Sequence, residues 1–186
     1  MVNIYLLKQE LSPAQNKVLD EILFERENTV LAYKILSKQY SSTKRNIKAI
    51  EKKLVGLYRQ LTVVDFGLRR VEFEIASIEN KYKAIDKAIK NYKESMQNFN
   101  RMLSNPNIRT LNPERPDDWC IRNLKSPLYL ANMSIESGLD AIRITKRYFK
   151  NITTAFQSHT AHQKFLKTLA ERKAMTEAEA AGPGSS

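Results

Sequence analysis

Apolar residues recur along the middle of the chain at alternating spacings of three and four residues. From Ile47 to Leu103 this spacing meets an apolar residue at every step, and it continues backward to Tyr33 with one exception, Thr43. Such spacing is the heptad repeat of an α-helix that buries one narrow stripe against a partner. The pattern therefore predicts an all-α protein with a long coiled-coil helix whose heptads cover about residues 33–103.

The apolar stripe of this helix is the predicted coiled-coil seam. Its positions are Ile47, Ile50, Leu54, Leu57, Leu61, Val64, Leu68, Val71, Ile75, Ile78, Tyr82, Ile85 and Ile89, followed by Tyr92, Met96, Phe99 and Leu103. A continuous helix over residues 33–103 would be about 105 Å long. One helix cannot bury its own seam, so we expect the return helix, another copy or a different protein to cover it.

The start of the long helix is marked by a capping box. Ser12 can cap the helix, Pro13 suits its first turn, and Gln15 stands where the reciprocal Glu or Gln belongs. We expect residues 1–11 to be a lead-in and residues 12–103 to be the long helical segment. The polar stretch Tyr40–Thr43 is the weakest part of the helical pattern.

Three prolines end the predicted long helix and open a loop over residues 104–125. They are Pro106, Pro113 and Pro116, and proline cannot continue an α-helix. A second, shorter return helix is predicted over residues 126–175, because Ser126 and Pro127 again resemble a cap followed by a first-turn proline. Residues 176–186 are expected to be a disordered tail.

The formal charge of the chain is +11, which favours acidic partners. One helical stretch has a marked excess of cations, and this predicted basic face consists of Lys44, Arg45, Lys48, Lys52, Lys53 and Arg59. The face is expected either to be solvated, to dock on an acidic protein, or to bind nucleic acid or membrane lipid.

Catalytic and ligand-binding motifs are not apparent. The sequence contains no phosphate-binding glycine loop, no HExxH and no CxxC, so we expect no enzyme activity, no cofactor and no small-molecule substrate. His159 and His162 have a spacing that can bind zinc, but a solvated or interfacial pair is favoured. The single cysteine, Cys120, fits a reducing compartment, and the chain lacks a secretory signal or a membrane-spanning stretch. We therefore expect a cytoplasmic protein.

The predicted loop and its flanking helices resemble the second half of a tektin, a coiled-coil protein of ciliary and flagellar doublet microtubules. The loop reads RPDDWCIRN over residues 115–123, against a tektin loop of the type Arg-Pro-Asn-Val-Glu-Leu-Cys-Arg-Asp. Before the loop, Ala84-Ile85 and Tyr92-Lys93 are six residues apart, and a helix opening at Leu128 follows it. The resemblance covers about residues 45–175.

The tektin resemblance implies a structural, cytoskeletal role in a ciliary or flagellar axoneme, as a filament or microtubule-associated component. It also implies an interaction loop that packs against the next subunit or tubulin, formed by Arg115, Pro116, Asp117, Asp118, Trp119 and Cys120. Two alternatives stay open from the residues themselves. One is a basic helical scaffold on an anionic membrane or nucleic acid, and the other is an adaptor subunit of a viral or secretion assembly.

Overall fold

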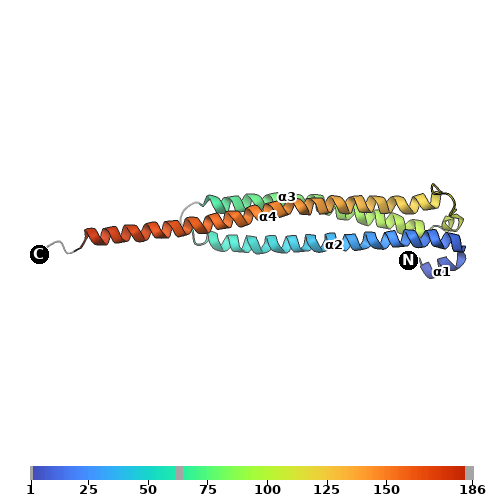
Figure 1. Ribbon diagram of the computed structural model, residues 1–186, viewed down its shortest axis with the longest axis horizontal. Coiled ribbons are helices and arrows are strands. Elements are labelled where there is room, and N and C mark those ends of the chain that lie inside the picture. Colours follow the sequence, from blue (N-terminus) through green and yellow to red (C-terminus); the bar gives the residue numbers. More distant parts are fainter. Residues whose placement is uncertain (1, 62–64, 183–186) are drawn as a thin grey trace. The chain divides into compact units, whose positions relative to one another are not determined.

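The computed structural model describes residues 2–61 and 65–182 of the chain. The described residues form four α-helices and a short 3-10 helix and contain no strand, so the predicted all-α class is confirmed (Figure 1). The elements are α1 (Ile4–Glu10), α2 (Pro13–Tyr58), α3 (Phe66–Leu103), η1 (Pro106–Thr110) and α4 (Trp119–Ala180). They divide into two compact units, the first formed by residues 1–46 and 80–144 and the second by residues 47–79 and 145–186.

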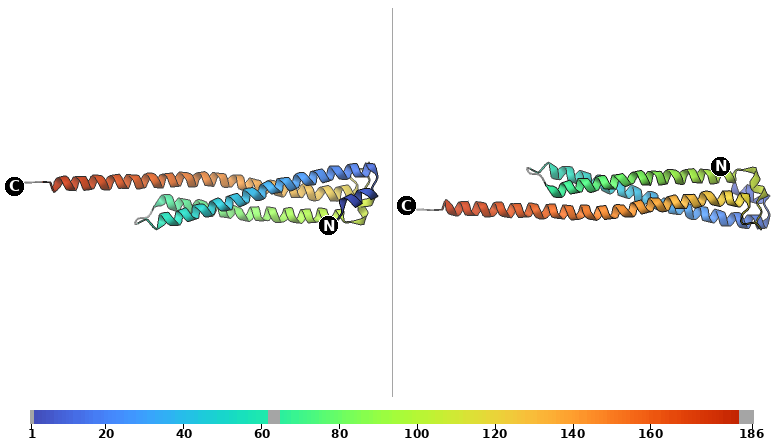
Figure 2. Two further views of the ribbon diagram at one scale, coloured as in Figure 1. Left: turned by 90° about the horizontal axis from the view of Figure 1, so that it is seen from below. Right: turned by 90° about the horizontal axis from the view of Figure 1, so that it is seen from above.

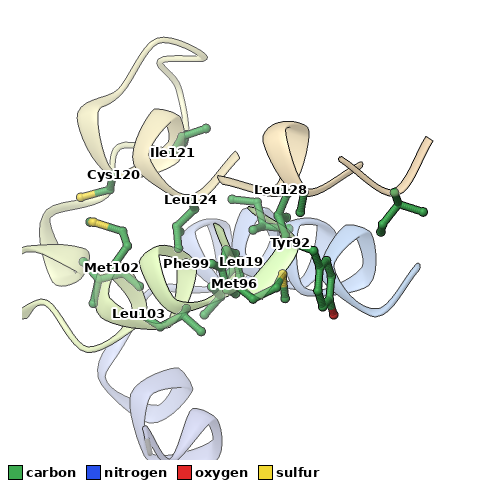
Figure 3. Packing of buried hydrophobic residues seen from close by; sticks show 14 of the residues in the cluster. Leu19, Tyr92, Met96, Phe99, Met102, Leu103, Cys120, Ile121, Leu124 and Leu128 are labelled. Atoms are coloured by element: carbon green, nitrogen blue, oxygen red, sulfur yellow. The ribbon is translucent and has the colours of Figure 1, made fainter. Parts of the chain in front are cut away.

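The first unit contains the larger hydrophobic core. In it α2 and α3 run antiparallel, because Tyr33 stacks on Tyr92 with ring centroids 4.0 Å apart while Tyr40 meets Tyr82 further back along α3 at 5.5 Å. The start of α4 packs on both helices. Figure 3 shows residues of all three helices meeting in this core, among them Leu19, Phe99, Leu124 and Leu128.

Close packing of α4 in the first unit depends on a glycine. A Cβ atom added to Gly138 would lie 2.9 Å from Leu36 Cδ2 in α2 and 3.2 Å from Ala88 Cβ in α3. A larger residue would therefore push α4 away from both neighbours. The missing side chain of Gly138 is what lets the three helices approach one another.

The second unit is built from the end of α2, the start of α3 and the continuation of α4. Its buried apolar residues come from all three segments: Ile47 and Leu54 from α2; Leu68, Val71, Ile75 and Ile78 from α3; and Ile152 and Ala155 from α4. Lys53 in α2 also lies over the ring of Phe156 in α4, 4.3 Å from its centroid. In the second unit, three helical segments thus bury one another's apolar side chains.

The prediction of one unbroken helix over residues 12–103 is wrong. Helix α2 ends at Tyr58, and α3 begins at Phe66 as the second arm of a helical hairpin. The final turn of α2 tightens into i to i−3 hydrogen bonds, in which Gln60 N–H donates to Leu57 O at 3.1 Å and Leu61 N–H donates to Tyr58 O at 3.2 Å. The side chain of Asp65 then caps α3 by accepting from Leu68 N–H at 3.2 Å.

The heptad pattern runs through this break because of the length of the connection. Residues 59–65 make up one heptad, so the apolar register of α2 resumes unchanged in α3. In the sequence, the apolar positions of the two arms therefore form one uninterrupted heptad pattern. The two arms and α4 bury most of that stripe within the chain, which removes the expectation that a seam of this length needs an outside partner.

Helix α4 also differs from the predicted return helix. It begins at Trp119, not at Ser126, because Asp118 Oδ2 accepts from Cys120 N–H at 2.9 Å and from Ile121 N–H at 3.3 Å. Its 62 residues make it longer than α2 with 46 or α3 with 38, so the expectation of a shorter return helix is wrong. The true connection between α3 and α4 covers residues 104–118 and contains η1.

Pro127 lies inside α4, where it removes one backbone hydrogen bond. Proline in a helix interior costs about 3 kcal/mol. Leu124 and Leu128, on either side of it, are completely or almost completely buried. Each contributes about 1.5–3 kcal/mol by burial, which offsets the cost of the proline.

The two ends of the chain agree with the sequence predictions only in part. Ser12 N–H donates to Gln15 Oε1 at 2.9 Å and Gln15 N–H donates to Ser12 Oγ at 3.1 Å, so the predicted capping box is confirmed. The lead-in contains α1, and the stretch Tyr40–Thr43 is helical. The tail prediction is wrong for residues 176–180, which belong to α4, and its residues 183–186 lie outside the described part of the chain.

Candidate protein-interaction surfaces

Among the described residues of the second unit, no other helix covers the last part of α4. Every residue from Thr160 to Ala180 is exposed, and we call this segment the α4 extension. Figure 2 shows α4 continuing past the ends of α2 and α3 within the second unit. At 1.5 Å per residue the extension is about 32 Å long.

The α4 extension carries large apolar side chains on one face. Phe165, Leu166 and Leu169 are 60%, 39% and 53% exposed, and their spacing of one and four residues groups them on adjacent turns. Met175 is 63% exposed six residues after Leu169, on a different face of the helix. An apolar cluster of this kind on an isolated helix is typical of a surface that binds another helix.

A buried polar cluster lies at the base of the extension. His159 Nδ1 and Asp65 Oδ2 are 2.5 Å apart, and the side chains are only 7% and 5% exposed. Burial raises the pKa of Asp65, but hydrogen bonds from His159 and from Leu68 N–H lower it more, so the pKa is below its usual value of 3.8. The pair fastens α4 to the start of α3.

Gly67 makes room for the His159–Asp65 contact. A Cβ atom at this position would lie 3.0 Å from Asp65 Oδ1, 3.1 Å from the backbone oxygen of Ala155 and 3.5 Å from His159 Cβ. The close approach of α3 and α4 therefore needs glycine here. Sequence reasoning missed Asp65, whose signal is a helix-capping aspartate before the turn of Leu68.

The predicted coiled-coil seam is turned inward in the structure. Most of its members are buried, and Ile50, Leu57, Leu61, Tyr82 and Ile89 are half-buried. Val64 lies outside the described residues. The seam therefore faces neighbouring segments of the same unit, so it is not the surface offered to a partner.

The predicted interaction loop separates into exposed and structural residues. Arg115, Pro116, Asp117 and Trp119 are exposed, and Arg115 Nε lies 3.7 Å from Asp117 Oδ1. Asp118 caps α4, as described above. Trp119 is 46% exposed at the first residue of α4, so it does not anchor the loop within the chain.

Cys120 belongs to the core of the first unit. Its side chain is buried, and Sγ donates to the backbone oxygen of Asn107 at 3.1 Å. Burial raises the pKa of the thiol, although a hydrogen bond with Thr110 opposes the change. A buried thiol with a raised pKa is a poor nucleophile, so the surroundings of Cys120 favour a packed structural residue.

The predicted basic face is exposed but not uniform. In the first unit Lys44 Nζ lies 4.1 Å from the ring centroid of Tyr40, and in the second unit Lys53 covers Phe156. Lys53 thus links α2 to α4, whereas Lys44 lies over a ring of its own helix and reaches α3 only at 5.7 Å from the ring centroid of Tyr82. Lys48, Lys52 and Arg59 are exposed in the second unit and form no ion pair among the described residues.

Tyr40 forms a polar link between α2 and α3 that the sequence pattern did not reveal. Its hydroxyl donates to Asp86 Oδ1 at 2.8 Å. Burial and this hydrogen bond raise the pKa of Tyr40, so the phenol stays protonated. The pattern indicated only that Tyr40 lies on the buried side of its helix.

Metal and membrane sites are not evident in the described part of the chain. No three or more His, Cys, Asp or Glu side chains there come together as a possible metal site, and His162 is exposed while His159 binds Asp65. None of the described helices is both long and apolar enough to cross a bilayer. Comparisons with protein-family models, curated proteins and solved structures gave no match, so the function is inferred from the residues of this chain.

Proposed function

We propose that this chain is a non-enzymatic structural protein that assembles with other polypeptides by coiled-coil pairing of its α4 extension. The observation that carries the proposal is the extension itself: a helix about 32 Å long, fully exposed, with Phe165, Leu166 and Leu169 on one face. Burying each of these side chains in an interface would contribute about 1.5–3 kcal/mol. While they are exposed to water, these side chains contribute nothing to the stability of the chain.

Chemical cross-linking of the full chain in its native assembly tests this proposal. Lys164, Lys167 and Lys173 lie in the extension, and we expect them to cross-link to another polypeptide. The double variant Phe165→Glu/Leu169→Glu should lower the affinity of the assembly by about 100-fold or more. Cross-links of the extension that stay within one chain, or that are unchanged in the double variant, would overturn the proposal.

A matched control distinguishes interface loss from a general effect of charge. Phe73 in α3 is 70% exposed and lies outside the extension. The variant Phe73→Glu should leave the intermolecular cross-links in place. Both variants replace exposed residues, so the circular dichroism of each should match that of the unmodified chain.

A narrower proposal is that the chain works as part of the cytoskeleton, as the tektin resemblance implies. Co-sedimentation with polymerised tubulin tests it, using Trp119→Ala in the loop and Phe24→Ala, 64% exposed in α2, as the matched control. We expect binding that weakens for Trp119→Ala and stays unchanged for Phe24→Ala. Equal pelleting with and without microtubules would contradict a microtubule-binding role and leave assembly through α4 in place.

A second candidate function is binding to an anionic surface through Lys48, Lys52 and Arg59. Their exposure without ion pairs among the described residues favours it, as does the net charge of +11. The test compares Lys48→Glu/Lys52→Glu with Lys90→Glu/Lys93→Glu, which makes the same change in net charge on exposed positions of α3. Only the first variant should weaken binding to DNA or anionic vesicles and flatten its dependence on salt.

A further inference from the structure

The α4 extension has a surface hollow of about 370 Å³ beside its apolar cluster. The residues that line the hollow are Ala161, Lys164, Phe165, Thr168, Leu169 and Arg172. Small residues between large ones form the kind of hole that receives a side chain of a facing helix. Two of the lining residues are cations and none is an anion, so the hollow is also suited to a negatively charged group.

Cations outnumber acidic residues around the apolar cluster. Residues 160–176 contain one acidic residue, Glu171, and four cations, which are Lys164, Lys167, Arg172 and Lys173. Arg172 and Lys173 follow Leu169 by three and four residues, so they lie one turn further along the same face of the helix. These charged side chains are exposed, and none of them forms an ion pair among the described residues.

We propose that the α4 extension binds an acidic amphipathic helix of another protein. The inference rests on the proposed function, and it names the chemistry of the partner. In the complex Phe165 and Leu169 pack against apolar residues of the partner helix, while Lys164, Arg172 and Lys173 lie beside its glutamate or aspartate side chains. Charges that border a coiled-coil seam determine which helices pair, so this surface selects an acidic partner.

The charge of the extension disfavours a second copy of the chain as the partner. Two extensions side by side would bring the same cations together, and the whole chain has a net charge of +11. Like charges across an interface suppress such pairing.

The form of the extension also favours a helix over an anionic membrane. A helix that lies in a membrane surface has an apolar face along its whole length. Here the apolar cluster of Phe165, Leu166 and Leu169 covers only about two turns, and Glu177 and Glu179 follow near the end of α4. These two acidic residues would be repelled by anionic lipid.

Synthetic helical peptides test the charge preference with the full chain. Each peptide has about three heptads with leucine at the core positions, and the flanking positions carry glutamate in one peptide and glutamine in the other. Fluorescence anisotropy should show that the glutamate peptide binds at least about fivefold more tightly. The difference should shrink as the salt concentration rises, because exposed charges are screened.

Charge reversal distinguishes the preference for an acidic partner from a general loss of the interface. Lys164→Glu/Arg172→Glu should bind the glutamate peptide at least about tenfold more weakly, and should gain affinity for a third peptide with lysine at the flanking positions. Lys146→Glu/Lys150→Glu is the matched control, because it makes the same change in net charge at exposed positions of α4 outside the extension. The control should bind the glutamate peptide within about twofold of the unmodified chain.

The other possible results each overturn the inference in a recognisable way. Equal affinity for the glutamate and glutamine peptides, lost in Phe165→Glu/Leu169→Glu, would overturn it and leave assembly through the extension in place. Binding to vesicles of phosphatidylcholine and phosphatidylserine without binding of the glutamate peptide would overturn it in favour of a membrane surface. A dimer of the chain alone that Phe165→Glu/Leu169→Glu dissociates would overturn it in favour of a second copy. No peptide binding, together with no intermolecular cross-links in the native assembly, would overturn the inference and the proposed function together.

Discussion

Replacing Asp65 by alanine should destabilise the second unit more than any change to its exposed surface. The carboxylate makes two buried contacts, with Leu68 N–H at 3.2 Å and with His159 Nδ1 at 2.5 Å. Loss of the helix cap costs about 1 kcal/mol. The buried imidazole left without a partner adds about 1–3 kcal/mol, for a total of about 2–4 kcal/mol.

Urea unfolding followed by circular dichroism at 222 nm measures this loss. Asp65→Asn is the matched control, because asparagine is also a good helix cap and keeps an oxygen that can accept from Leu68 N–H. It loses only the negative charge facing His159, so we expect it to recover at least about 1 kcal/mol relative to Asp65→Ala. A loss below about 0.5 kcal/mol for Asp65→Ala, the size of an ordinary surface change, would refute the reasoning.

The pH dependence gives an independent check on Asp65. Its pKa in the folded chain is lowered from 3.8, so the carboxylate stabilises the fold at pH values above 3.8. That stability is lost as the pH falls from 3.8 through the lower folded-state pKa. The free-energy gap between the unmodified chain and Asp65→Asn should therefore shrink as the pH falls below 3.8; a gap that persists in acid would contradict the assignment.

Three further predictions follow from close contacts. Gly67→Ala should destabilise by about 1–3 kcal/mol in urea unfolding, because its Cβ would press on α4, whereas Gly56→Ala, with nothing within 4 Å of the new Cβ, should be neutral or stabilise by up to about 1 kcal/mol. Gly138→Ala should cost about 1–3 kcal/mol in the same assay through its contact with Leu36. The Cys120 thiol should react slowly with a disulfide reagent at pH 8 in the folded chain and rapidly in urea; equal rates would contradict its burial.

Helical content and buried faces could be predicted from the sequence, because periodicity reports which side of a helix meets its neighbours. The capping box at Ser12 and Gln15 was also readable, since both partners lie within one turn. The sequence pattern did not show that the chain reverses its direction after Tyr58. A connection of one heptad leaves the apolar register unchanged, and the cap at Asp65 gives only a short local signal.

The start of α4 shows a second limit of local signals. Ser126-Pro127 has the form of a helix start, but the helix already begins at Trp119, capped by Asp118. Tertiary burial of Leu124 and Leu128 outweighs the cost of an internal proline, and burial cannot be counted from the sequence.

The one-heptad connection between α2 and α3 also makes this fold suited to domain swapping. If α2 and α3 were joined end to end into one rod, their apolar positions would form a continuous stripe, and a second chain could supply the missing arm. In such an exchange the apolar positions of α2 and α3 would be buried against a second chain in place of the same one. The cap at Asp65 and the close fit at Gly67 are then the features that keep the chain folded on itself.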